Sequence, residues 1–367
     1  MRRLDLPDFP WDTLAPYADR ARGHPDGVVD LSVGTPVDPV PAVVRTALAE
    51  AGDSPGYPAT YGTTALREAA AEWMARRLGV CHADPAAVLP LIGAKEFIAW
   101  LPMLLGAGPG DRVGIPALAY PTYAVGAQLA GAQPVAVDGT VDVGPARLAL
   151  LWVNSPANPT GRVLPAVHLR KIVDWCRERG TIVVSDECYI EFGWDAEIPP
   201  TSILHPDVCG GRPDGILAVH SLSKRSNMAG YRAGFVAGDP QLVGRLLEVR
   251  KHAGMMVPAP VQAAMAAALR DDTHVDEQRL RYRRRRAALW QALEAAGMTV
   301  EHSEGGLYLW VTRGEECWRT VEWFAERGIL VAPGAFYGPA GRRHVRVALT
   351  ATDERIAAAV QRLGAAG

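Results

Sequence analysis

Short runs of apolar residues alternate with helix-type patterns from about residue 65 to residue 250. Several runs are apolar at every position, which is typical of parallel strands covered by helices on both faces. The alternation predicts an α/β fold with a mostly parallel seven-stranded sheet flanked by helices. The candidate strands are 87–92, 112–115, 134–137, 148–153, 181–185, 215–220 and 233–237, and the candidate helices between them are 95–105, 123–130 and 165–179.

The C-terminal third of the chain has a different pattern. Two helical segments precede a strand at 306–311, and a helix, a strand at 344–348 and a last helix follow. This order predicts a small α+β domain that the N-terminal stretch completes. We expect an N-terminal segment (1–44) joined to a small domain (259–367), with the large domain at 45–258.

Composition narrows the possible functions. A net charge of −2 gives no electrostatic reason to bind nucleic acid or an anionic membrane. The basic run at 279–286 follows acidic residues within a helix pattern, which indicates a solvated helix face. No apolar run approaches the roughly 20 residues that span a bilayer, and the N-terminus lacks the apolar core of a secretory signal. Five cysteines without a C-x-x-C pair argue against disulfides, so we expect a cytoplasmic protein without a metal site.

Lysine is rare in this chain, because only four of its 38 basic residues are lysines. Arginine keeps its proton, whereas lysine can lose it and attack a carbonyl once burial or a nearby cation lowers its pKa. Lys224 follows the apolar run 215–220, so we expect it near the carboxyl end of a strand, where ligands bind in open α/β sheets. Ser221 and Arg232 lie on either side of it in the sequence, and their side chains can donate hydrogen bonds to a phosphate. The segment fits an aldehyde cofactor that bears a phosphate.

The segment 221–234 resembles the Schiff-base lysine region of fold-type-I pyridoxal-phosphate enzymes, specifically the class I/II aminotransferases. Further motifs extend this resemblance over almost the whole chain. It implies a fold-type-I transferase that binds pyridoxal 5′-phosphate. It also implies ping-pong transfer of an amino group between an amino acid and a 2-oxo acid, with glutamate and 2-oxoglutarate as the expected pair. Lys224 would hold the cofactor and move the substrate proton.

Asp186 ends the buried run 181–185, where a carboxylate is tolerated only if it meets a cation. The resemblance implies that Asp186 pairs with the protonated pyridine nitrogen of the cofactor, which keeps the ring an electron sink. It also implies that Tyr189 hydrogen-bonds the cofactor's 3′-oxygen. An aspartate that caps a turn is the alternative, but a spacing of 38 residues before Lys224 fits the family.

Asn158 belongs to the sequence Asn-Pro-Thr-Gly, which follows the run 148–153. These residues form turns readily, so a plain β-turn is the alternative. In the resembled family the matching asparagine donates its side-chain amide to the cofactor's 3′-oxygen. We therefore expect Asn158 to contact both cofactor and substrate.

Gly93, Ala94 and Lys95 join a predicted strand to a predicted helix. Backbone N–H groups at a helix N-terminus suit a phosphate dianion. The resemblance places these residues in a phosphate cup that Ser221 and Arg232 complete, and Arg232 can hold two phosphate oxygens. Family members often carry Ser or Thr in this cup, so Lys95 departs from the pattern.

Two pairs of tyrosines are candidates for contacts with the cofactor. Tyr120 aligns with the aromatic residue that stacks on the pyridine ring in the family, and Tyr123 is the alternative. Tyr57 matches the tyrosine that reaches the phosphate of the neighbouring subunit, and Tyr61 is the alternative. This resemblance implies a homodimer with shared active sites.

Arg346 falls at the position of the arginine that binds the substrate α-carboxylate in the family. Gly34 should face it, since a side chain there would obstruct the carboxylate. Arg342 and Arg343 are the alternatives to Arg346, although loop positions exposed to solvent suit them better.

Two other functions fit the sequence less well than an aminotransferase. A serine hydrolase of the S-x-x-K type would use Ser221 as nucleophile, but the accompanying S-D-N and K-T-G sequences are absent. An aminotransferase-like DNA-binding regulator would need a helix-turn-helix module, and only about 30 residues precede Leu31.

The substrate is harder to predict. Dicarboxylate-specific members take a second arginine from the partner subunit, but residues 254–260 contain none and carry two methionines, which suit a bulkier side chain. With the sequences at 9–12 and 30–38, the chain is similar to actinobacterial N-succinyldiaminopimelate aminotransferases. We expect an N-succinyl-LL-2,6-diaminopimelate aminotransferase of lysine biosynthesis. The alternative is a broad-specificity aminotransferase that uses aspartate, alanine or aromatic donors.

Overall fold

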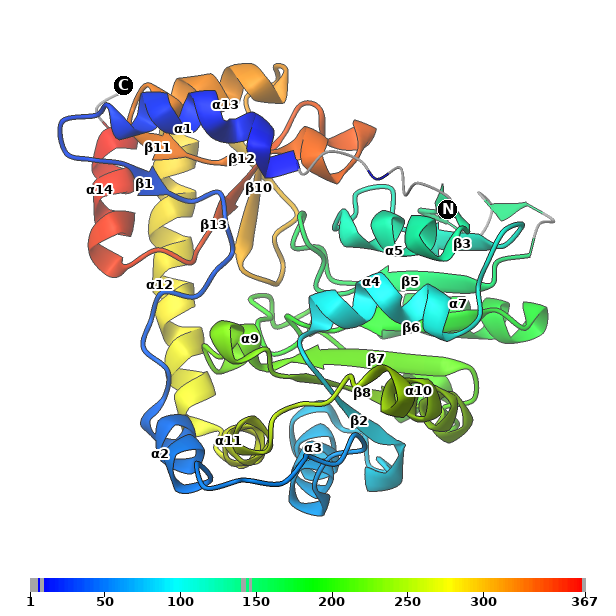
Figure 1. Cartoon of the computed structure of the whole chain (residues 1–367). Helices are drawn as coiled ribbons and strands as arrows, with labels where there is room; N and C mark the ends of the chain where they lie inside the picture. The colour runs from blue at the N-terminus through cyan, green and yellow to red at the C-terminus, as the bar shows by residue number, and fades with distance from the viewer. Residues whose placement is uncertain (1–5, 7–9, 140–142, 145–146, 365–367) are drawn as a thin grey trace.

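The computed structural model describes residues 6, 10–139, 143–144 and 147–364, so Phe9, which opens the 9–12 sequence, lies outside it. The described residues form a seven-stranded sheet of order β2-β8-β7-β6-β5-β3-β4, a four-stranded sheet of order β12-β13-β10-β9, and a two-stranded pairing of β1 with β11 (Figure 1). All seven candidate strands lie in the first sheet. The α/β prediction is therefore confirmed.

The seven-stranded sheet is parallel except at β8, which runs antiparallel to both β2 and β7. The predicted strand bounds differ from the observed ones by at most two residues. The strands are β2 (Val88–Leu91), β3 (Arg112–Ile115), β4 (Gln133–Ala136), β5 (Leu150–Asn154), β6 (Ile182–Asp186), β7 (Ile216–Ser221) and β8 (Gly234–Gly238).

Helices cover both faces of this sheet, which explains its uninterrupted apolar runs. In β7, Leu217 and Val219 pack toward one layer of helices, while Ile216 and Ala218 pack toward the other. The first layer contains α4 (Ala94–Leu104), α5 (Thr122–Ala130) and α10 (Pro240–Ala253), and the second contains α2 (Ala42–Glu50), α3 (Thr64–Leu78), α7 (Ala166–Arg179), α8 (Pro206–Cys209) and α11 (Ala259–Arg270).

The four-stranded sheet has its own hydrophobic core, to which the N-terminal stretch contributes. β1 (Val29–Asp30) runs parallel to β11 (Ile329–Leu330), so the two ends of the chain meet here. The segment after β1 then passes beside α12 toward α2 (Figure 1). The remaining elements are α1 (Ala15–Arg22), α12 (Thr273–Ala295), β9 (Thr299–Glu301), β10 (Tyr308–Thr312), α13 (Cys317–Ala325), β12 (Ala332–Pro333), β13 (Val345–Ala348) and α14 (Asp353–Gly364).

The basic run on α12 is only partly solvated, contrary to expectation. Arg285 is buried, donates two hydrogen bonds to the Asp38 carboxylate at 2.7 and 2.8 Å, and donates to Asp353 Oδ1 at 2.6 Å. It lies on the same helix face as the buried residues Tyr282 and Leu289, because residues three and four apart share a face. Arg285 therefore ties α12 to the segment after β1.

None of the helices in the described ranges is both long and apolar enough to cross a membrane.

Candidate active site

A cavity of about 560 Å³ opens at the carboxyl ends of β5, β6 and β7, where Asn154, Asp186 and Ser221 end the strands. This is the edge of an open α/β sheet at which ligands bind. The cavity brings together most of the residues singled out from the sequence. They are Gly34, Ala94, Lys95, Tyr120, Asn158, Asp186, Tyr189, Ser221, Lys224, Arg232 and Arg346.

Lys224 lies on a one-turn helix, α9 (Leu222–Arg225), directly after β7. Ser221 begins this helix, because its Oγ accepts a hydrogen bond from the Ser223 N–H at 3.2 Å. The Lys224 ammonium donates to the Gly34 carbonyl oxygen. Burial lowers the pKa of Lys224 below its ordinary value. The amine therefore becomes neutral, and so nucleophilic, more readily than an exposed lysine.

Asp186 is a buried carboxylate with two hydrogen bonds. Its Oδ2 accepts from the Tyr123 hydroxyl at 2.7 Å, and its Oδ1 accepts from the Cys188 N–H at 3.1 Å. Burial raises the pKa of Asp186 above its ordinary value. Within the described part of the chain no cation pairs with it. The site is therefore electrostatically prepared for a cationic ligand group.

A cradle for an anion lies beside Asp186, at the start of α4. Gly93 has φ +94°, and a Cβ there would lie 2.7 Å from Arg232 Cζ, so only glycine lets the guanidinium approach. The first-turn N–H groups of a helix have no acceptor within the helix and attract anions. Ser221 Oγ adds a hydroxyl at the cavity wall. This donor set suits a phosphate.

The two tyrosines near the sheet edge have different surroundings. Tyr120 lines the cavity, and Lys95 Nζ lies 5.6 Å from the centroid of its ring. Tyr123 is fully buried, stacks on Trp152 with ring centroids 5.0 Å apart, and does not line the cavity. Of the two, only Tyr120 has a ring at the cavity wall.

Arg346, on β13, enters the cavity from the four-stranded sheet. It is buried, its Nη1 donates to Asn158 Oδ1 at 2.8 Å, and its Nη2 donates to the Ser32 carbonyl at 2.6 Å. In the described structure Arg346 Nε has no hydrogen-bond partner and no carboxylate pairs with the guanidinium. Because its Oδ1 accepts from Arg346, the Asn158 amide must direct its N–H₂ group elsewhere. A carboxylate ligand would complete the Arg346 site.

Tyr308 on β10 makes contacts in the cavity that the sequence did not indicate. A Cβ at Gly34 would lie 2.8 Å from the Tyr308 ring, so the missing side chain leaves room for that ring. Arg346 in turn lies over that ring, with its Cζ 4.0 Å from the centroid. The Tyr189 hydroxyl lies 2.9 Å from the Tyr308 hydroxyl, so it already has a partner within the chain.

Tyr57 is remote from this cavity. Its side chain is 97% exposed, and Tyr61 is 47% exposed, with the Arg67 guanidinium 5.1 Å from its ring centroid. The Tyr57 side chain therefore packs against almost nothing within the single chain.

The cavity also has lining residues that the sequence did not single out. Trp11, Val33, Ile98, Cys188 and Tyr308 all contribute to it. Trp11 packs against the aromatic pair 336–337 of the C-terminal region, with ring centroids 5.2 and 6.5 Å away. These residues sit in ordinary apolar patterns, and only the tertiary fold brings them to the site.

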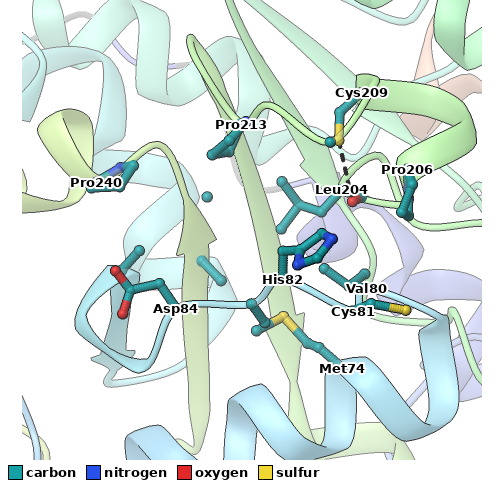
Figure 2. A pocket seen from close by; sticks show the side chains of 15 residues that line it. Met74, Val80, Cys81, His82, Asp84, Leu204, Pro206, Cys209, Pro213 and Pro240 are labelled. Carbon is teal, nitrogen blue, oxygen red and sulfur yellow. Dashed lines mark hydrogen bonds between the residues drawn. The ribbon is translucent and has the colours of Figure 1, made fainter.

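A second cavity, of about 70 Å³, lies between the residues that follow α3, the end of α8 and the end of β8 (Figure 2). Met74, Leu204 and several prolines line it, and Cys209 Sγ donates to the Leu204 carbonyl. Its volume corresponds to about two water molecules, and its lining includes no lysine or arginine. It therefore cannot hold a phosphorylated cofactor. The described residues also include no cluster of three or more His, Cys, Asp or Glu suited to a metal ion.

The sequence pattern described as "Aminotransferase class I and II" matches residues 26–363. The chain is 63% identical to the 4-dedimethylamino-4-oxo-anhydrotetracycline transaminase OxyQ of Streptomyces rimosus, over 98% of this chain and 99% of that one. It is also 63% identical to a "probable aminotransferase" of Mycobacterium tuberculosis, over 98% and 85%. An LL-diaminopimelate aminotransferase of Aquifex aeolicus is 33% identical, over 92% and 90%.

Among solved structures, a probable N-succinyldiaminopimelate aminotransferase of Thermus thermophilus superposes with a TM-score of 0.87 and 28% identity. The superposition covers 98% of this chain and all of that one. Thus the relatives at 63% identity are not described as diaminopimelate enzymes, whereas more distant ones are.

Proposed function

This chain belongs to the class I and II aminotransferases, which depend on pyridoxal 5′-phosphate, and from that membership we propose which residues hold the cofactor and which substrate it serves. Its fold is that of the fold-type-I enzymes of this class. The chain is therefore an aminotransferase. The roles of individual residues and the identity of the amino donor are our proposals.

The residues of the cavity fit pyridoxal phosphate. Lys224 is the amine that would hold the aldehyde, and Asp186 is the buried carboxylate that lacks a cation. Arg232 and Ser221 would hold the phosphate together with the first turn of α4, in the cradle that a Cβ at Gly93 would fill. When bound, the cofactor supplies an electron-withdrawing ring that stabilises negative charge at the substrate Cα.

The other cavity residues would orient the substrate and move its proton. Arg346 binds the α-carboxylate through its guanidinium and so directs the substrate Cα toward Lys224. The Lys224 amine removes the Cα proton, and its lowered pKa makes it neutral more readily than an exposed lysine. Tyr120 packs on one face of the cofactor, and the Asn158 amide and Tyr189 hydroxyl face its 3′-oxygen. The observation that carries the proposal is that Lys224, Asp186 and Arg346 line one cavity, the latter two without a charged partner among the described residues.

Loss of activity in Lys224→Ala tests this assignment. The variant should lose turnover by several orders of magnitude, because Lys95, the other lysine of the cavity, lies at the proposed phosphate cradle. Lys251→Ala is the matched control, since Lys251 is exposed and pairs with Glu248 at the end of α10. Near-normal turnover of Lys224→Ala would contradict the proposed role of Lys224.

For the substrate, we propose N-succinyl-LL-2,6-diaminopimelate, with 2-oxoglutarate as the amino acceptor. The Thermus structure and the Aquifex relative, whose names refer to diaminopimelate compounds, support this proposal. A second candidate is a polycyclic ketone such as the one named for OxyQ. The 63% identity to OxyQ favours it, as do Trp11 and Ile98, which give the cavity an apolar wall.

Comparison of kcat/KM across amino donors and acceptors distinguishes these candidates. The purified enzyme, saturated with pyridoxal phosphate, is assayed with N-succinyl-LL-2,6-diaminopimelate, with the OxyQ ketone and glutamate, and with aspartate, alanine and aromatic amino acids. The highest value for the succinyl compound would support the proposal, and the highest for the ketone would replace it. Similar values for all donors would favour the broad-specificity alternative.

We also propose that the enzyme is a homodimer in which Tyr57 reaches the phosphate of the partner subunit. Its 97% exposure in the single chain supports this role, because the side chain is free to contact a partner subunit. A fully active monomer by light scattering would contradict it.

The proposed domain division remains 1–44, 45–258 and 259–367. The parallel pairing of β1 with β11 supports placing the N-terminal segment with the small domain.

A further inference from the structure

The Asp186 carboxylate has a hydrogen-bond donor that the proposed chemistry leaves unexplained. The Tyr123 hydroxyl donates to Oδ2 at 2.7 Å, while the Cys188 N–H donates to Oδ1 at 3.1 Å. Tyr123 is fully buried and does not line the cavity. It therefore cannot touch a ligand, and any effect on the ligand must pass through Asp186.

Packing fixes the Tyr123 ring. It stacks on Trp152 of β5 with centroids 5.0 Å apart and planes inclined at 24°, and it meets Tyr120 edge-on at 6.1 Å. The residue lies in the first turn of α5, whose other side packs on α4. With the ring held on both sides, the hydroxyl has a fixed direction, and it donates to the Asp186 carboxylate.

We propose that Tyr123 is a positioning residue that keeps Asp186 ionised and aimed at the pyridine nitrogen of the cofactor, a role that rests on the proposed pairing of Asp186 with that nitrogen. A hydrogen bond to a carboxylate stabilises its charged form and makes it a weaker base. A weaker base leaves the shared proton on the nitrogen. Burial raises the pKa of Asp186, and the hydrogen bonds from Cys188 and Tyr123 oppose that effect.

Tyr123→Phe keeps the ring and removes only the donor. With pyridoxal phosphate labelled with ¹⁵N, the nitrogen chemical shift of the loaded enzyme reports its protonation as pH is varied. We expect the proton affinity of the nitrogen to fall roughly tenfold to a hundredfold, the range that one hydrogen bond to a charged group supports. Tyr282→Phe, which removes a hydroxyl from another fully buried ring, should leave the titration unchanged.

A double-mutant cycle separates this inference from the proposed function. In Asp186→Asn the nitrogen should lose its proton, and adding Tyr123→Phe should change nothing further, because Tyr123 acts through the carboxylate. If Tyr123→Phe alone leaves the titration unchanged while Asp186→Asn shifts it, the inference is wrong and the cofactor assignment stands. If Asp186→Asn has no effect either, the assignment itself fails.

A second substitution covers the case in which Tyr123→Phe does not fold. Fluorotyrosine at position 123 keeps the shape of the ring but has a more acidic hydroxyl, which donates more strongly. It should raise the proton affinity of the nitrogen, opposite to the effect of removing the donor. A shift in the other direction, or none, would overturn the inference.

Discussion

Glu187 and His220 form a buried titratable pair directly behind the active site, next to Asp186 and Ser221. Glu187 Oε2 lies 3.7 Å from His220 Nε2, and both side chains are at most 2% exposed. The Ile203 N–H donates to Glu187 Oε1 at 2.7 Å. Burial raises the pKa of Glu187 from 4.5 to about 7 and lowers the pKa of His220 from 6.5 to about 3. Both groups therefore favour their neutral forms in the folded protein.

The two pKa shifts have opposite effects on stability. Between pH 4.5 and about 7 the folded state holds a Glu187 proton that the unfolded state has released, so the free energy of unfolding falls as pH rises. Between about pH 3 and 6.5 the unfolded state holds a His220 proton that the folded state lacks, so the free energy rises with pH. Each slope is about 1.4 kcal/mol per pH unit, and the two cancel between pH 4.5 and 6.5.

Single substitutions should expose each slope. Relative to the unmodified enzyme, Glu187→Gln should gain about 3 kcal/mol of stability from pH 4.5 to 6.5, because only the His220 effect remains. His220→Phe should lose about as much over the same range. The assay is urea unfolding of the enzyme at fixed protein concentration and saturating pyridoxal phosphate, followed by tryptophan fluorescence.

Glu197→Gln, at an exposed position, is the matched control and should follow the unmodified enzyme at every pH. Relative slopes of the same sign for Glu187→Gln and His220→Phe would refute the reasoning. The reasoning would also be refuted if the free energy of unfolding of either variant changed with pH as it does in the control. Burial would then not perturb the pKa values of the pair.

Four further predictions concern the cofactor and the shared site. Gly93→Ala should weaken pyridoxal phosphate binding roughly tenfold to a hundredfold in a fluorescence titration, because the added Cβ displaces the Arg232 guanidinium; unchanged affinity would contradict the cradle. Borohydride reduction and peptide mapping should label Lys224, and a label on another lysine would refute its role. Arg346→Ala should lower kcat/KM about thirtyfold or more, the effect of losing about 2 kcal/mol or more from a buried charge pair; little change would exclude it as the carboxylate ligand. Mixing Lys224→Ala with a severely impaired Tyr57 variant should rebuild one active site per dimer, whereas no rescue after confirmed subunit exchange would refute the composite site.

The sheet could be predicted well because its strands are continuous apolar runs. Burial on both faces places apolar residues at consecutive positions, as from Ile216 to Val219 in β7, so the sequence signal is strong. The one-turn helix that carries Lys224 could not be predicted from periodicity, since four residues are too short to show it. What fixes this helix is a local contact, the Ser221 cap, and the surrounding tertiary structure.

The site could be predicted only where a residue type and its spacing carried chemical information. Asp186 and Lys224 are such residues. Tyr308 is not, because a tyrosine in an apolar strand has the pattern of a core residue, and its contact with Tyr189 spans 119 positions. The burial of Arg285 could not be predicted for the same reason, since its acceptor Asp38 lies 247 residues away along the chain. Partners so distant along the chain are set by the packing of whole elements.

The active site brings together two opposite charges, one from each sheet. Neither charge has a charged partner in the described structure. Asp186 ends a strand of the seven-stranded sheet, and Arg346 lies on the four-stranded sheet. Burying either charge alone is costly, and each cost is offset when a ligand supplies the opposite charge. Asn158 contacts Arg346 directly, since its Oδ1 accepts from that guanidinium, and in our proposal its amide N–H₂ group faces the cofactor. Carboxylate binding at Arg346 and cofactor binding at Asp186 should therefore be coupled through one side chain, so that each ligand stabilises the arrangement the other requires.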